Sequence, residues 1–144
     1  DRSDCHFVIV GNGTEYPKIE SFVKEYKPKN VSLFKSLPKE DYDKLASSCD
    51  VGLIFLDYPS RLLPYLMEKK PILTVTDPNC DTGALAEENG YGLYCPSNSV
   101  EKFVESVDKM LSSDRKQMGE RGYQFFLDNY TSEHTYQAIV KHCK

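Results

Sequence analysis

The sequence has no long apolar run, no excess of basic residues and no visible signal peptide. A transmembrane helix needs ~20 consecutive, predominantly apolar residues, and no segment approaches that length. The formal net charge is −4, so the chain carries no basic surplus with which to neutralise the phosphates of a nucleic acid. These absences disfavour a membrane-spanning protein and a nucleic-acid-binding protein.

The sequence also lacks a C-x-x-C pair, and its five cysteines and three histidines are scattered. An odd number of widely spaced cysteines predicts neither a disulfide framework nor a zinc site. A reduced, cytosolic setting suits such a chain best. We interpret the histidines as ordinary packed or solvated side chains.

The 144 residues are the usual length of one domain, and an apolar content of 40% is enough for a packed core. We therefore predict a single domain over residues 1–144. The first residue is Asp1 rather than Met, and we interpret the chain as a fragment of a longer protein.

Short apolar runs alternate with segments of helical periodicity along the chain. The predicted strands cover residues 6–10, 31–34, 51–56, 71–76 and 91–95. The predicted helices cover residues 17–26, 39–49, 61–68, 82–89, 100–111, a segment around 123–127, and 132–142. This alternation predicts an α/β fold, with a mainly parallel sheet of about five strands and helices on both faces. Ligands in such sheets bind at the carboxyl edge of the strands.

The loop after the first strand reads Gly11, Asn12, Gly13 and leads into a helix. Glycines let the backbone approach a phosphate closely, and the amino end of a helix favours an anion. A dinucleotide-binding fingerprint would have a third glycine where the sequence has Tyr16. Two interpretations stay open here, a phosphate-binding loop and a tight strand-to-helix turn.

The loop after the third strand ends in Ser60, Arg61 and Leu62. The Ser60 hydroxyl suits a helix N-cap, and Arg61 adds a bidentate phosphate donor in the first turn. The alternative is a capped helix with a solvated arginine.

The loop after the fourth strand holds Asp77, Asp81, Thr82 and Gly83. Its two carboxylates suit sugar or ribose hydroxyls, but turns and N-caps also favour aspartate. By the sequence alone, the turn interpretation is the stronger one. No nucleophile–base pair or G-x-S-x-G motif is present, so no catalytic residue is assigned. The lysines at positions 24–29 and 69–70 are expected to be solvated.

The order of these signals resembles the C-terminal domain of retaining glycosyltransferases of family 4, which have the GT-B fold. The resemblance covers nearly the whole chain and rests on residues 7–13, 31–38, 50–53, 70–73, 90–93 and 129–131. Residues 59–63, 65–66, 76–78 and 81–83 resemble a subgroup that builds capsule and O-antigen repeats, some of whose members use amino sugars such as N-acetylfucosamine. The family's two glutamates, separated by seven intervening residues, are replaced here by Leu56 and Pro64, and the family's usual loop glycine is replaced by Ser36.

The resemblance implies one Rossmann-like half of a GT-B glycosyltransferase that binds a nucleotide sugar, expected to be a uridine diphosphate sugar, with no metal or other cofactor. In that family Lys35, Ser36 and Leu37 would face the nucleobase, and Ser60, Arg61 and Leu62 would meet the diphosphate or ribose. Asp77, Asp81, Thr82 and Gly83 would lie near the same pocket. An upstream phosphate-binding segment and the acceptor-binding N-terminal domain precede this part in the family.

The expected function is therefore sugar transfer in capsular or surface polysaccharide synthesis by a bacterial, cytoplasmic enzyme that associates with the inner membrane face. The isolated chain is expected to be inactive, because transfer needs donor and acceptor to be held together. The alternatives are a related GT-B sugar-nucleotide epimerase and a non-catalytic α/β phosphate-binding module.

Overall fold

The computed structural model describes residues 2–55 and 61–142. The chain divides into two compact units, unit 1 over Asp1–Ala46 and unit 2 over Ser47–Lys144, and each is described by itself. The single domain expected from the chain length stays a prediction. In the described parts of the chain, no helix combines the length and the apolar character needed to cross a membrane.

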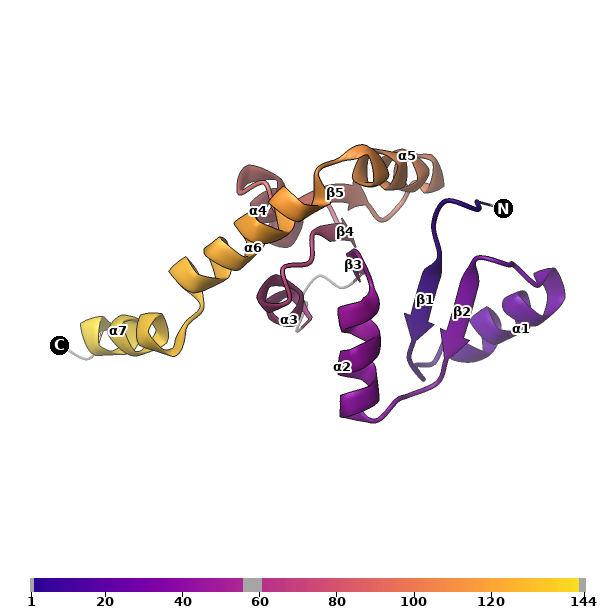
Figure 1. The fold of residues 1–144 in the computed structure, drawn as a ribbon, viewed down its shortest axis with the longest axis horizontal. Helices are drawn as coiled ribbons and strands as arrows, with labels where there is room; N and C mark the ends of the chain where they lie inside the picture. Colours follow the sequence, from indigo (N-terminus) through magenta and orange to yellow (C-terminus); the bar gives the residue numbers. More distant parts are fainter. Residues whose placement is uncertain (1, 56–60, 143–144) are drawn as a thin grey trace. The chain divides into compact units, whose positions relative to one another are not determined.

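Unit 1 is a β–α–β unit. Strand β1 (Phe7–Val10) pairs in parallel with β2 (Val31–Phe34), and helix α1 (Tyr16–Tyr26) connects them (Figure 1). Pro17 lies in the first turn of α1, where its missing N–H would have no helical partner. Helix α2 (Lys39–Ser48) begins in this unit. No described side chain from residue 2 to residue 46 is buried, so this unit has apolar contacts but no sealed core.

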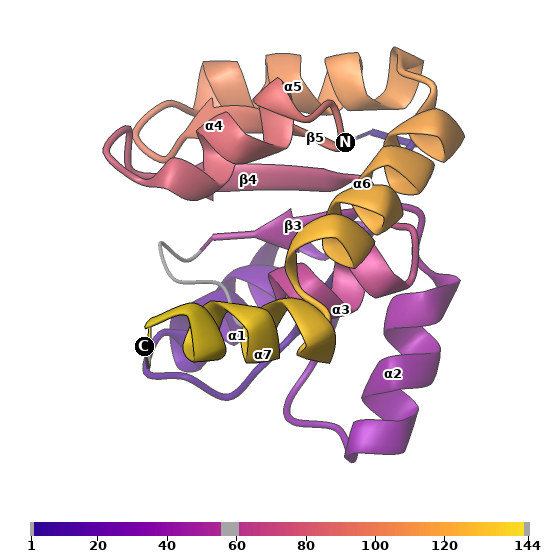
Figure 2. The same ribbon diagram turned by 90° about the vertical axis from the view of Figure 1, so that its left-hand side faces the viewer.

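Unit 2 contains a three-stranded parallel sheet in the order β3-β4-β5. Its elements, labelled in Figures 1 and 2, are β3 (Gly52–Ile54), α3 (Leu62–Met67), β4 (Ile72–Thr76), α4 (Asp81–Glu88), β5 (Gly92–Pro96), α5 (Val100–Ser112), α6 (Arg115–Asn129) and α7 (Ser132–His142). Every residue of the central strand β4 is buried, as expected for a parallel strand that is covered on both faces.

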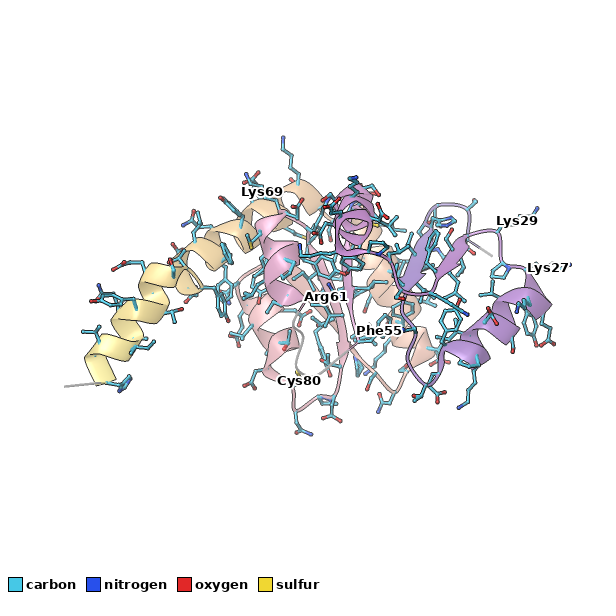
Figure 3. All side chains as sticks on the ribbon, turned by 90° about the horizontal axis from the view of Figure 1, so that it is seen from below. Lys27, Lys29, Phe55, Arg61, Lys69 and Cys80 are labelled. Carbon is cyan, nitrogen blue, oxygen red and sulfur yellow. The ribbon has the colours of Figure 1, made fainter. Side chains whose placement is uncertain are left out.

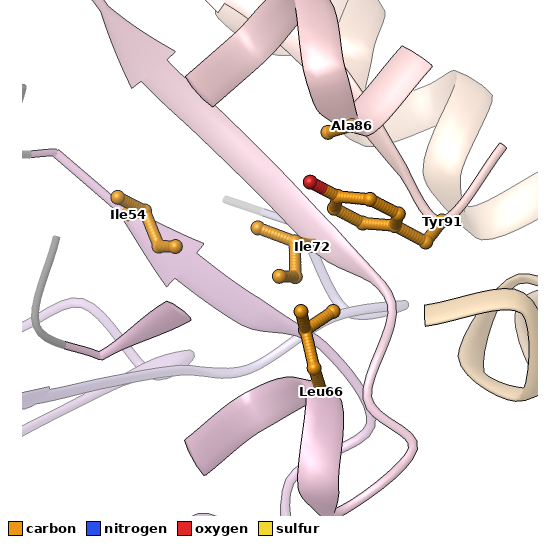
Figure 4. Packing of buried hydrophobic residues seen from close by; sticks show 5 residues of the cluster. All are labelled: Ile54, Leu66, Ile72, Ala86 and Tyr91. Carbon is orange, nitrogen blue, oxygen red and sulfur yellow. The ribbon is translucent and has the colours of Figure 1, made fainter. Parts of the chain in front are cut away.

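The core of unit 2 joins its sheet to α3 and α4. Figure 4 shows the cluster, in which Leu66, Ile72, Ala86 and Tyr91 are fully buried and Ile54 is nearly so. Aromatic side chains of α6 extend it, because the Tyr91 and Phe125 ring centroids are 5.0 Å apart. The core therefore fixes α3 against the sheet and brings α6 over the same cluster.

Local groups cap α5 at its start and close α4 at its end. The Ser99 hydroxyl accepts a hydrogen bond from the Lys102 N–H at 3.2 Å and caps α5. Gly90 follows α4 with a φ of 66°, the left-handed conformation that glycine adopts without strain.

The predicted fold class is confirmed as a Rossmann-like α/β arrangement of parallel strands and helices, with five strands in the described residues. These strands form a sheet of two and a sheet of three rather than one hydrogen-bonded sheet, because β1 and β3 each pair with one neighbour only. The third strand is shorter than predicted, and Phe55 directly after it is 59% exposed. The apolar stripe of α5 buries Val107 and Met110 but leaves Val100 exposed.

Candidate functional site

In unit 1, the structure brings together two loops that the sequence analysis singled out separately. The Gly11 N–H lies 3.1 Å from the Phe34 carbonyl oxygen and 3.0 Å from that of Lys35, and it donates to both. The loop after β1, with Asn12 and Gly13, and the loop after β2 therefore start side by side at the carboxyl edge of this sheet. Ser36 is exposed and Leu37 is half-buried in the second loop.

Gly11 and Gly13 have open space where a side chain would stand. A Cβ added at either position would meet no atom of the described residues within 4 Å, its chain neighbours aside. Neither residue has a positive φ, since Gly90 is the glycine that does so among the described residues. Neither packing nor the left-handed conformation of a tight turn therefore requires glycine at these two positions. Room for the close approach of a ligand is the property that glycine supplies there.

Lys35 brings a positive charge to the same edge of unit 1. Its Nζ lies 5.8 Å from the ring centroid of Tyr16, the first residue of α1. No side chain caps the amino end of α1, where Glu15 is the N-cap residue. Glu15 instead pairs with Lys18 at 2.6 Å. The first-turn N–H groups of Tyr16 and Lys18 donate to the carbonyls of Gly13 and Glu15, and Pro17 has none. The helix dipole and the nearby ammonium are therefore what suit an anionic ligand here.

In unit 2, Arg61 is the N-cap residue of α3, with φ −87° and ψ −11°. Its carbonyl accepts a hydrogen bond from the Tyr65 N–H at 3.3 Å, and its side chain is exposed. The predicted helix began one residue earlier; the structure starts α3 at Leu62, because Arg61 supplies the first accepting carbonyl. Ser60, the predicted N-cap, lies outside the described residues, as do Leu56 and residues 57–59.

The carboxyl end of α3 is closed by Lys69, which has a φ of 53°. The Lys69 N–H donates to the Leu66 carbonyl at 3.1 Å and the Lys70 N–H to the Tyr65 carbonyl at 2.9 Å, the pair of bonds of a Schellman motif. A residue with a Cβ in this left-handed conformation costs about 1–2 kcal/mol.

Lys69 and Lys70 were expected to be solvated, and both are engaged. The Lys69 Nζ pairs with Glu120 at 2.8 Å, and the hydrogen bond from this carboxylate raises the pKa of Lys69. The Lys70 Nζ donates to the Ser47 carbonyl at 2.7 Å. Sequence reasoning missed Lys69; the available signal was the lack of any glycine between α3 and Pro71, which obliges another residue to take the left-handed position.

The loop after β4 is a turn built on Asp77. Its Oδ1 accepts from the Asn79 N–H at 2.9 Å and from the Asn79 Nδ2 at 2.8 Å, and its carbonyl accepts from the Cys80 N–H at 3.0 Å. Turn chemistry, the stronger interpretation of the sequence, therefore accounts for an aspartate at this position. Asp81 is the first residue of α4, and its side chain is exposed.

Thr82 and Gly83 lie on the buried side of α4. The Thr82 Oγ1 lies 3.4 Å from the Cys80 Sγ. A Cβ on Gly83 would overlap the Tyr94 ring and come within 3.2 Å of the Thr74 Oγ1. Close packing of α4 on the sheet therefore accounts for the glycine, and a ligand-binding role for either residue stays a prediction.

The same edge of unit 2 holds two polar groups that the sequence analysis did not single out. Among the described residues, the buried Thr76 Oγ1 and Tyr94 hydroxyl have no hydrogen-bond partner. Burial, followed by the negative charge of Asp77, raises the pKa of Tyr94. The signal available in the sequence was the pair of threonines in an otherwise apolar central strand.

Within residues 2–55 and 61–142, no three His, Cys, Asp or Glu side chains are grouped as a metal site would require. The described cysteines Cys5, Cys49, Cys80 and Cys95 are not paired with one another in disulfide bonds. The chemistry that the described site residues offer is thus that of backbone amides, hydroxyls, carboxylates and the cations of Lys35 and Arg61.

These features lie on a scaffold that belongs to a known family. A sequence model of the family described as "Glycosyl transferases group 1" matches residues 1–125. Because the match extends over most of its length, the chain belongs to this family of glycosyltransferases.

Individual relatives agree with the family. The chain is 30% identical over 132 residues to an uncharacterized glycosyltransferase of Methanocaldococcus jannaschii, with 85% of the chain and 36% of the relative covered. Among solved structures, it is similar to a sucrose-phosphate synthase of Thermosynechococcus elongatus, with a TM-score of 0.74 at 14% identity over 93% of the chain and 36% of that protein. It is also similar to WaaG, a glycosyltransferase involved in lipopolysaccharide biosynthesis, with a TM-score of 0.69 at 18% identity over 92% of the chain and 36% of WaaG.

The two structural similarities show a shared fold. The chain spans 36% of the length of each of these three relatives.

Proposed function

We propose that the chain is the donor-binding part of a glycosyltransferase and that it binds a uridine diphosphate sugar. The observation that carries this proposal is the open space at Gly11 and Gly13, on a scaffold of the glycosyltransferase group 1 family. The six other glycines of the chain face described atoms that would obstruct a Cβ, whereas these two face none. A glycine at a position with no packing or conformational need leaves room for a ligand to approach the backbone.

The charges around Gly11 and Gly13 favour a diphosphate as that ligand. The positive end of the α1 dipole lies at this end of the helix, and the Lys35 Nζ lies 5.8 Å from the ring centroid of Tyr16 in its first turn. The backbone at Lys35, Ser36 and Leu37, which starts beside Gly11, is proposed to face the nucleobase. This part of the proposal concerns unit 1 alone.

For unit 2, taken by itself, we propose that Arg61 contacts a phosphate group. The residue lies beyond the carboxyl end of β3, where ligands of parallel α/β sheets bind. Its guanidinium supplies a planar pair of donors that matches two phosphate oxygens. Asp81, exposed in the first turn of α4, is the proposed acceptor for a ribose or sugar hydroxyl, because Oδ1 of Asp77 is already engaged in its turn.

The whole enzyme is proposed to transfer a sugar during surface polysaccharide synthesis. Support comes from the subgroup motifs at residues 59–63 and 81–83 and from the similarity in fold to WaaG, which acts in lipopolysaccharide synthesis. The isolated chain is proposed to be inactive in transfer, because a bound donor without a positioned acceptor lacks the proximity on which such reactions depend.

The test is a titration of the chain with uridine diphosphate, followed by NMR or calorimetry. Arg61→Ala is expected to weaken binding by about 1.5–3 kcal/mol, the contribution of a charged hydrogen bond. Arg121→Ala is the matched control and should leave the affinity unchanged. Arg121 is an exposed arginine on α6 of the same unit, and its Nη2 donates to the Gln117 Oε1 at 3.2 Å.

Unfolding free energies of both variants are measured alongside, so that a misfolded variant is recognised. Equal affinities for the wild type and a folded Arg61→Ala variant would show that Arg61 is only a surface residue. A wild-type chain that does not bind uridine diphosphate at all would contradict the proposed donor.

A further inference from the structure

Helix α3 is too short to hold its own position. It has six residues, and isolated helices of that length are not stable in water. Its placement is therefore set by tertiary contacts, of which the fully buried Leu66 is one. Arg61 stands at its amino end and Lys69 just beyond its carboxyl end, and Figure 3 labels both.

A single residue, Lys69, connects the carboxyl end of α3 to α6 in three ways. Its carbonyl lies so close to Gly119 that any Cβ at that position would overlap it. Its Nζ lies 3.1 and 2.8 Å from the two carboxylate oxygens of Glu120. The same Nζ lies 4.9 Å from the ring centroid of Tyr123. Gly119, Glu120 and Tyr123 belong to adjoining turns of α6, so both the backbone and the side chain of Lys69 are held by one helix face.

The left-handed backbone conformation of Lys69 raises the question of why a lysine occupies this position. A glycine would take the φ of 53° without strain and would end α3 equally well. A lysine is disfavoured there, and an ion pair as exposed as that with Glu120 contributes little to the free energy of unfolding. Global stability is therefore a poor explanation for lysine at this position, whereas a fixed orientation of α3 accounts for both the strain and the contacts.

We propose that Lys69 is a positioning residue, which fixes α3 on α6 and thereby sets where α3 presents Arg61 to the phosphates of the donor. This proposal rests on the donor-binding role of Arg61 proposed above. Lys69 itself touches no ligand in this account; it acts through the helix.

The decisive variant is Lys69→Gly, which removes the side-chain contacts and the backbone strain together. We expect an unfolding free energy equal to or above that of the wild type, but an affinity for uridine diphosphate lower by about three- to tenfold, within the range of couplings between connected residues. Amide hydrogens of Tyr65, Leu66 and Met67 should exchange faster, although the protein as a whole is no less stable. Lys69→Arg keeps a cation for Glu120 and should restore the affinity.

Lys27→Gly is the matched control. Lys27 is the other described lysine with a left-handed backbone, with a φ of 46° at the end of α1, and it lies in unit 1. The same relief of strain there should leave both the affinity and the exchange of α3 unchanged.

A double-mutant cycle identifies the route of the effect. In an Arg61→Ala background, Lys69→Gly should cause no further loss of affinity, because the group that it positions is already absent. A full additional loss in that background would show that Lys69 does not act through Arg61.

Two other outcomes overturn the proposal, and they are distinguishable from failure of the proposed function. Unchanged uridine diphosphate affinity and unchanged α3 exchange in Lys69→Gly, with a wild type that binds, would overturn the positioning role alone. So would an affinity that falls only in step with a lower unfolding free energy. A wild-type chain that does not bind uridine diphosphate would overturn the donor-binding role and this proposal with it.

Discussion

The two units differ most in how deeply their side chains are buried. Unit 2 contains the buried strand β4 and the fully buried Leu66 and Tyr91, whereas unit 1 buries none of its described side chains. The glycines differ in the same sense: Gly119 of unit 2 is required by a neighbouring carbonyl, and Gly13 of unit 1 faces open space. Gly119 thus serves packing in unit 2, whereas Gly13 leaves room in unit 1. Of the two, only a glycine that leaves room indicates a ligand.

The largest expected effect tests the core of unit 2. Leu66→Ala should lower the free energy of unfolding by about 3–5 kcal/mol, because it removes a fully buried side chain and leaves a cavity. Met67→Ala, one residue later and 55% exposed, is the control and should cost less than about 1 kcal/mol. Urea unfolding measures both. Similar losses for the two variants would mean that α3 does not pack as described.

The next effect sharpens the contrast between the glycines. Gly119→Ala should destabilise the chain by about 1–3 kcal/mol or more, because its methyl group would overlap the Lys69 carbonyl and force α3 and α6 apart. The paired change in unit 1, Gly11→Ala, should alter the unfolding free energy by no more than about 0.5–1 kcal/mol and in the stabilising direction. A neutral Gly119→Ala would contradict the close approach of these elements.

The sequence predicts the order of the elements well, because each strand is a short apolar run and each helix has its own periodicity. Residues 72–76 are the clearest case: an apolar run after Pro71 predicts a core strand, and β4 is buried throughout. The division into two sheets is not predictable in this way, because hydrogen-bond partners of β1 and β3 are set by tertiary placement rather than by local pattern.

The candidate site is less predictable than the fold. The sequence does not distinguish Gly13 from Gly119. Gly119 packs against the Lys69 carbonyl, which is distant along the chain, whereas Gly13 faces open space. Lys69 looks like a solvated lysine until the φ of its backbone and the position of Glu120 are known. Asp77 is the opposite case. The sequence favours a turn at this aspartate, and a turn accounts for the hydrogen bond that its side chain accepts from the Asn79 N–H.

The smallest effect concerns a hydroxyl in the core of unit 2. Burial raises the pKa of Tyr91 to about 12 from its ordinary value of 10.0, and its hydroxyl has no partner among the described residues. Tyr91→Phe should therefore change the unfolding free energy near neutral pH by less than about 1 kcal/mol, in the stabilising direction.

The effect of Tyr91→Phe should grow at alkaline pH. The unfolded chain ionises this tyrosine near its ordinary pKa, and the folded chain resists ionisation until about pH 12. Its contribution to stability is therefore complete below pH 10.0 and is lost as the pH rises towards 12. Unfolding is measured for wild type and variant at about pH 8 and about pH 11. The unfolding free energy of the variant, relative to that of the wild type, should be higher at the higher pH. A constant difference would mean that Tyr91 is accessible to water.

The central claim is that the open glycines of unit 1 make room for a donor phosphate, and Gly13→Ala tests it most directly. We expect a chain of unchanged or slightly higher unfolding free energy, since the added Cβ meets no atom of the described residues within 4 Å. We also expect an affinity for uridine diphosphate at least about tenfold weaker, because the methyl group occupies the space of the ligand. A Gly13→Ala chain that folds normally and binds uridine diphosphate as tightly as the wild type would contradict the account.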